Sequence, residues 1–164
     1  MQYVKRFAEL GIKDVPLVGG KNASLGEMYR ELKGEGIEVP NGFATTAEAY
    51  RLYIEHNNLH ERIAKALEAL DTHDVRALAV TGAKIRQWIM HGAMPQPLVE
   101  EIREAYKALE AEYGENTDVA VRSSATAEDL PTASFAGQQE TYLNIRGTTN
   151  LLSTCKQVFA SLFT

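Results

Sequence analysis

Four amphipathic segments between residues 45 and 109 constrain the fold of this 164-residue chain most strongly. In each segment, apolar residues recur at the three- and four-residue spacing of a helix that packs one face against a core. Thr45 and Glu48 have the spacing of a capping box at the start of the first segment. Pairs typical of turns separate the segments: Asn57-Asn58, Asp71-Thr72 and Met94-Pro95. The pattern predicts four consecutive helices and a helix-rich core.

A further helix is expected on each side of this central group. Near the N-terminus, Asn22 or Ser24 can cap a helix that ends at Gly34 and Gly36. Near the C-terminus, residues 151–163 carry apolar side chains at helical spacing, without a Gly, Pro or basic stop signal. Such an uncapped apolar helix is expected in a segment cut from a longer chain.

Three segments have the character of strands. Residues 38–44 contain Pro40 and Gly42, which predicts an edge strand at most. Residues 119–121 predict a buried strand, and residues 140–145 predict a second strand with alternating faces. The predicted fold class is therefore α+β, helix-rich with a small, mostly antiparallel sheet.

Charge and composition exclude several classes of function. The chain has 17 Lys and Arg against 22 Asp and Glu, a net charge of −5, and no basic cluster, so no nucleic-acid partner is expected. It has no signal peptide and no apolar run of about 18 residues, so no membrane partner is expected. Cys155 is the single cysteine, which excludes an intrachain disulfide and indicates a reducing compartment. A cytoplasmic location is predicted.

Gly19-Gly20-Lys21 is the first of two candidate anion sites. The glycines allow close approach of the backbone to a ligand, Lys21 adds a positive charge, and a helix is expected to begin directly afterwards. Helix N-termini present unpaired N–H groups and about half a positive charge, so they bind anions. The alternative is a tight turn with a solvated lysine.

Arg122 and the segment after it form the second candidate. Seven acidic residues lie between residues 110 and 140, so solubility is a poor explanation for an arginine at the end of a predicted strand. A guanidinium fixed there can bind phosphate oxygens bidentately. Residues 123–138 are mostly small or polar and can supply hydroxyl and backbone donors to a polyphosphate. The alternatives are an ion pair with Glu128 or Asp129, or a disordered linker.

Five collinear motifs, spread over nearly the whole chain, resemble the N-terminal signatures of the phosphoenolpyruvate synthase (pyruvate, water dikinase) family. They are VGGKNASLGEM (residues 18–28), VPNGFATT (39–46), IRQWI (85–89), VRSSATAEDLP (121–131) and ASFAGQQET (133–141). The resemblance implies that residues 1–164 are the N-terminal part of an ATP-grasp nucleotide-binding domain. Residues 1–113 would form its helix-rich part, and residues 114–164 a strand–loop–strand–helix part.

The resemblance also implies a reaction and residue roles. ATP, pyruvate and water would give phosphoenolpyruvate, AMP and phosphate, with Mg²⁺, through a phosphohistidine on another domain. Lys21 and Arg122 would contact the ATP phosphates, with Arg86 a further candidate for the same phosphates. Gly137 and Thr141 would belong to the segment that covers the nucleotide. Charge neutralisation and positioning of this kind carry most of the catalysis of phosphoryl transfer.

Several family elements are expected outside this segment. The metal-binding carboxylates, the phosphohistidine and the pyruvate-binding domain have no matching motif here, so no catalytic or metal-binding residue is assigned. The full-length protein is expected to be a homodimer. The alternatives are an antibiotic-inactivating dikinase that resembles rifampicin phosphotransferase, and a non-catalytic helical interaction module. Pyruvate, phosphate dikinase fits less well, because its loop differs after the strand-end Arg-Ser.

Overall fold

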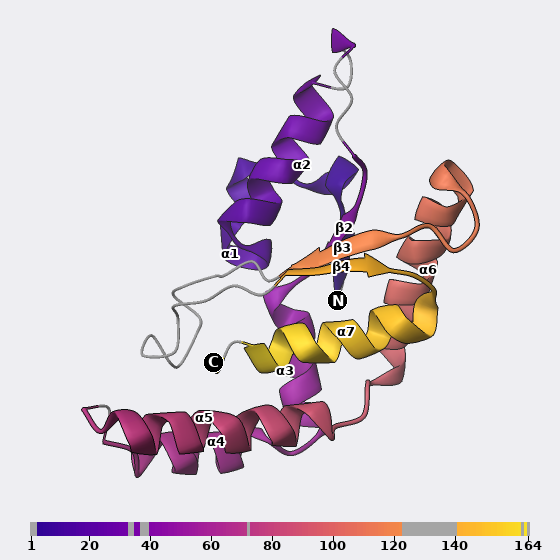
Figure 1. Ribbon diagram of the computed structural model, residues 1–164. Coiled ribbons are helices and arrows are strands. Elements are labelled where there is room, and N and C mark those ends of the chain that lie inside the picture. Colours follow the sequence, from indigo (N-terminus) through magenta and orange to yellow (C-terminus); the bar gives the residue numbers. More distant parts are fainter. Residues whose placement is uncertain are drawn as a thin grey trace.

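The computed structural model describes residues 3–32, 35–36, 40–71, 73–122, 141–161 and 163 (Figure 1). The helices of this part are α1 (Val15–Val18), α2 (Gly20–Leu32), α3 (Ala47–His56), α4 (His60–Glu68), α5 (Val75–Met90), α6 (Gln96–Tyr113) and α7 (Thr148–Ser161). The strands are β1 (Val4–Arg6), β2 (Phe43–Thr45), β3 (Val119–Arg122) and β4 (Thr141–Ile145). Helices and strands alternate irregularly along the chain, which confirms the predicted helix-rich α+β class.

The four central helices and the C-terminal helix are confirmed as α3, α4, α5, α6 and α7. The cap of α3 lies one residue later than predicted. Thr46 rather than Thr45 precedes the helix, and its Oγ1 accepts a hydrogen bond from the Ala49 N–H at 3.3 Å. Asp74 caps α5 by accepting from the N–H groups of Arg76 and Ala77. These polar side chains satisfy N–H groups that the helices leave unpaired.

The main core lies between α3, α5, α6 and α7. In Figure 1, α7 lies along the β3–β4 pair, and α4 and α5 lie side by side. The largest fully buried side chains of this core include Tyr53, Tyr106, Ile85, Ile89, Leu98 and Ile102. The helical spacing of these apolar residues in the sequence therefore marks the faces that the helices bury.

A smaller core joins α1, α2 and the first residues of the chain. It contains Phe7, Leu10, Val18, Ala23, Tyr29 and Ala44. A Cβ added at Gly26 would lie 2.4 Å from the Leu10 Cβ, so a glycine is required where α2 approaches this loop.

The prediction that Asn22 or Ser24 caps α2 is wrong, because the helix begins at Gly20 and the Ala23 N–H donates to the Gly19 carbonyl. Gly34 lies outside the described residues.

The described strands form two separate antiparallel pairs rather than one small sheet. β1 pairs with β2 through the register Val4↔Thr45, and β3 pairs with β4. The edge strand predicted over residues 38–44 is confirmed at β2, but its partner β1 was not predicted. The prediction that residues 119–121 are buried is wrong, because Ala120 is exposed. α7 packs on one face of the pair.

Within the described ranges, no helix has the length and apolar character needed to cross a lipid bilayer.

Candidate functional site

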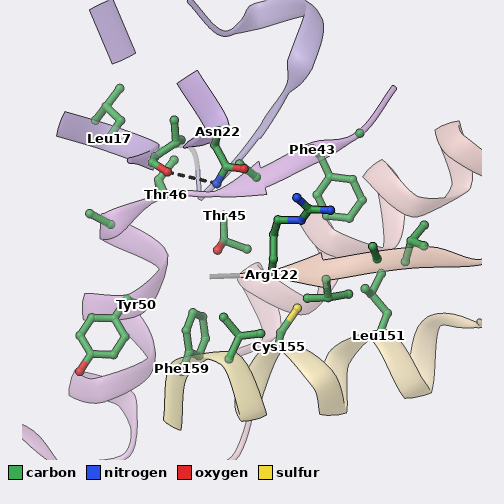
Figure 2. A pocket seen from close by; sticks show the side chains of 18 of the residues that line it. Leu17, Asn22, Phe43, Thr45, Thr46, Tyr50, Arg122, Leu151, Cys155 and Phe159 are labelled. Carbon is green, nitrogen blue, oxygen red and sulfur yellow. Dashed lines mark hydrogen bonds between the residues drawn. The ribbon is translucent and has the colours of Figure 1, made fainter. Parts of the chain in front are cut away.

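A cleft of about 1310 Å³ opens between β2 with the start of α3 on one side and β3 with α7 on the other (Figure 2). Its walls are mostly apolar. Phe43, Tyr50, Val121, Leu151, Cys155 and Phe159 line it, together with the polar residues Asn22, Thr45 and Arg122. An apolar cavity with a few placed polar groups is typical of a small-molecule site.

Arg122, which the sequence predicts to bind an anion, lies at this cleft. It is the last residue of β3, and Figure 2 shows its side chain directed into the space between β3 and β2. Its side chain is exposed, and among the described residues it has no ion-pair partner within 4.0 Å. The alternative partners Glu128 and Asp129 lie outside the described residues. Within the described ranges, the guanidinium therefore faces the cleft without a carboxylate bound to it.

Thr141 lies directly opposite Arg122 on the neighbouring strand β4. Both side chains are exposed, and residues paired in this way leave a sheet on the same face. The structure thus brings together two of the five residues selected from the sequence, of which Arg122 lines the cleft and Thr141 does not. Gly137 lies outside the described residues.

Lys21 is exposed in the first turn of α2 and is not among the residues that line the cleft. Its neighbour Asn22 does line it, and the Asn22 Nδ2 donates to the Val18 carbonyl at 3.1 Å. This hydrogen bond, drawn in Figure 2, ties α2 to the end of α1. The sequence predicts only a possible helix cap at Asn22, because no local pattern shows which side of a first helical turn faces a cleft.

Arg86 lies on α5 and is also absent from the cleft lining. Its Nη1 donates a 2.7 Å hydrogen bond to the carbonyl oxygen of Phe163, just after the end of α7. A cation is favourable there because the last carbonyl groups of a helix carry partial negative charge. In this structure Arg86 therefore joins α5 to the end of α7.

α7 contributes four lining residues to the side of the cleft that it shares with β3. The Tyr50 and Phe159 rings meet edge to face with their centroids 5.7 Å apart. Burial raises the pKa of the Cys155 thiol to about 12 and raises the pKa of Tyr50 as well. Both groups therefore stay protonated at neutral pH. Helical spacing identified Cys155 and Phe159 as apolar positions, but only the fold shows that they also face a cleft.

A second arginine at the cleft has its charge offset locally. Arg51 lines the cleft, and its guanidinium forms an ion pair with Glu48 within α3. Across the described part of the chain, no three His, Cys, Asp or Glu side chains lie close enough to hold a metal ion. The cleft lining carries charges of both signs, with Arg51 and Arg122 beside Glu55 and Asp118.

Comparisons with known proteins identify the family of this chain. Residues 15–164 match the family described as pyruvate phosphate dikinase, AMP/ATP-binding domain. The chain is 60% identical over 163 residues to phosphoenolpyruvate synthase of Pseudomonas aeruginosa, an alignment that covers 99% of this chain and 20% of the relative. It is 56% identical over 162 residues to the synthase of Neisseria meningitidis serogroup B, with 98% and 20% covered.

Phosphoenolpyruvate synthase of Escherichia coli (strain K12) is 54% identical over 157 residues, an alignment that covers 96% of this chain and 20% of the relative. The chain thus spans about a fifth of the length of the curated relatives that it matches. The resemblance inferred from the five sequence motifs is confirmed. The chain belongs to the pyruvate phosphate dikinase AMP/ATP-binding domain family.

Proposed function

We propose that this chain is the ATP-binding segment of a phosphoenolpyruvate synthase, which converts ATP, pyruvate and water to phosphoenolpyruvate, AMP and phosphate. The observation that carries the proposal is Arg122, a cation at the edge of an apolar cleft, without an ion-pair partner in the described part of the chain. The family match and the names of the relatives support the same substrate class.

The chemistry of the Arg122–Thr141 pair suits a polyphosphate. A guanidinium offers parallel N–H donors to two phosphate oxygens, and a threonine hydroxyl offers one more donor. Lys21 and Gly137 complete the proposed contacts: Lys21 adjoins Asn22, which lines the cleft. Arg86 would reach the phosphates only by releasing the Phe163 carbonyl. In phosphoryl transfer, such donors stabilise charge that spreads over the phosphate oxygens.

The proposed fold and assembly follow the resemblance. Residues 1–113 and 114–164 would be the two parts of the N-terminal portion of an ATP-grasp domain, in a cytoplasmic, homodimeric enzyme. Small-molecule sites usually enclose about 300–1,000 Å³. The cleft of about 1310 Å³ is larger, which leaves room for residues from the rest of a full-length protein.

Magnesium is expected with ATP, where it would neutralise charge on the phosphate oxygens. Mg²⁺ is usually held by one or two carboxylates together with substrate phosphates and water. The described residues contain no cluster of three potential ligands, and the carboxylates that would hold the ion are proposed for other parts of the full-length enzyme. The phosphohistidine and the pyruvate site are likewise proposed for other parts of the full-length enzyme.

Hydrogen exchange on the full-length enzyme tests this assignment. A non-hydrolysable ATP analogue should slow amide exchange in peptides that contain β3 and β4. Residues 75–83 of α5 do not line the cleft, so their exchange should stay unchanged as an internal control. A helical interaction module would show no such protection. Turnover assays with pyruvate and with rifampicin then separate the two dikinase activities, and phosphorylation of rifampicin alone would contradict the proposed acceptor.

A further inference from the structure

The pairing of β3 with β4 contains a bulge in its middle. Val119 pairs with Ile145, whereas Val121 pairs with Tyr142. One residue of β3 therefore faces two residues of β4, Leu143 and Asn144. Asn144 has φ = 58°, in the left-handed region. An extra residue with this conformation on one strand is the geometry of a β-bulge.

The bulge decides which side chain of β4 lies opposite Arg122. Successive side chains of a strand point to opposite faces. Without the extra residue, counting back from Ile145 would place Tyr142 opposite Arg122 and turn Thr141 toward α7. With it, Thr141 lies opposite Arg122, and Tyr142 shares the half-buried face with Ile145. The exposure of the side chains along β4 agrees with this register.

We infer that Asn144 is a positioning residue, whose left-handed conformation sets the register that places Thr141 beside Arg122, at the edge of the proposed nucleotide cleft. The inference rests on the proposed ATP-binding function. Asparagine and glycine adopt positive φ readily, whereas a β-branched residue does so only under strain. A β-branched residue at position 144 should therefore remove the bulge and shift residues 141–143 by one position against β3.

Asn58 provides a matched control for backbone strain. It has φ = 55° and an exposed side chain, but it lies in the turn between α3 and α4 and does not line the cleft. A valine at position 58 meets the same conformational difficulty as a valine at position 144. Only the change at position 144 alters the pairing of Thr141 with Arg122.

The test uses the full-length enzyme and the kinetic constants for ATP and for pyruvate. Asn144→Val should lower kcat/KM for ATP at least tenfold and leave the KM for pyruvate unchanged. Asn144→Gly, which keeps positive φ accessible, should stay within twofold of the wild type. Asn58→Val should lower the Tm about as much as Asn144→Val but stay within twofold in ATP kinetics. Equal kinetic losses in Asn58→Val and Asn144→Val would overturn the inference.

A double variant tests whether Asn144 acts through Thr141. In the Thr141→Ala background, the further change Asn144→Val should lower kcat/KM for ATP by less than twofold. The bulge positions Thr141, and in this background Thr141 has already lost its hydroxyl. Full additivity would overturn the inference. If Asn144→Val does not yield folded enzyme, Asn144→Ala provides a milder change with the same expected direction.

Arg122→Lys distinguishes a failure of the proposed ATP site from a failure of the role inferred for Asn144. Unchanged ATP kinetics in Arg122→Lys would contradict the proposed site itself. Impaired Arg122→Lys and Thr141→Ala, beside an Asn144→Val with wild-type kinetics, would overturn only the positioning role of Asn144.

Discussion

Arg122 at the end of β3 lies directly opposite Thr141 at the start of β4, so the two side chains leave the strand pair on the same exposed face. A guanidinium and a hydroxyl are thereby held side by side next to an apolar cleft. The opposite face of the pair packs against α7, which fixes the strands without using either side chain. The pair can therefore serve a ligand, and its replacement should affect binding more than folding.

The first prediction concerns Arg122. Arg122→Lys keeps the charge but loses the bidentate fork, so kcat/KM for ATP in the full-length enzyme should fall by about 10²-fold, the usual loss for one donor to developing charge. The Tm should hardly change, because exposed substitutions usually alter stability by less than about 0.5 kcal/mol. Steady-state kinetics and thermal unfolding measure the two effects. Arg146→Lys, an exposed arginine just after β4, is the control and should match the wild type.

A structural role for Arg122 would give a different result. If the guanidinium were the buried partner of a carboxylate, Arg122→Ala would cost about 3–5 kcal/mol of stability. A strongly destabilised Arg122→Ala, beside a fully active Arg122→Lys, would contradict the phosphate-binding role.

Lys21 gives the second prediction. Its side chain is exposed and does not line the cleft, so Lys21→Ala should leave the Tm within the range of an ordinary surface change. If Lys21 contacts a phosphate, turnover with ATP should nevertheless fall strongly. Lys13→Ala, another exposed lysine outside the cleft lining, is the matched control. Identical kinetics in the two variants would remove Lys21 from the site.

Arg86 should behave in the opposite way. Its hydrogen bond to the Phe163 carbonyl is charge-assisted and partly buried, and such bonds contribute about 1.5–3 kcal/mol. Arg86→Ala should therefore lower the free energy of unfolding by an amount of that order, measured by chemical denaturation. Arg76→Ala changes an exposed arginine on the same helix and should be nearly neutral. An Arg86→Ala enzyme with unchanged stability and a raised KM for ATP would favour a phosphate contact instead.

The fourth prediction concerns pH and Cys155. Burial raises the pKa of this thiol from 9.0 to about 12. At a pH between these two values, the folded state therefore binds more protons than the unfolded state. Stability is then lost as the pH rises, by up to about 1.4 kcal/mol per pH unit. Below pH 9 the effect is absent, because the thiol is protonated in both states.

Alkylation of Cys155 measures this burial directly, because the thiolate is the reactive form. In the native full-length enzyme at about pH 8.5, iodoacetamide should leave the peptide containing Cys155 unmodified. In urea, iodoacetamide should modify this peptide completely. Mass spectrometry of the digested protein quantifies both states. Rapid alkylation of the native enzyme at that pH would show that the thiol is accessible and ionised.

Local patterns were sufficient to predict most of the helices. The apolar spacing around Ile85, Ile89, Leu98 and Ile102 marks buried helix faces, because helical periodicity depends only on neighbouring residues. The motifs around Lys21 and Arg122 were likewise sufficient to identify the family, which the match over residues 15–164 confirms. The sequence also predicted that Arg122 ends a strand and Thr141 lies near the start of another.

Only the tertiary structure decided how these elements combine. β1 is a three-residue strand whose partner β2 lies far along the chain. At the start of β1, the N–H groups of Tyr3 and Val4 donate hydrogen bonds to the Glu101 carboxylate on α6. The bulge at Asn144 depends on which residues of β3 pair with β4. The pairing of Thr141 with Arg122 depends on the same register. Strand partners, register and the walls of a cleft are long-range properties. The free energy that selects them comes from packing between distant segments, which no local spacing in the sequence records.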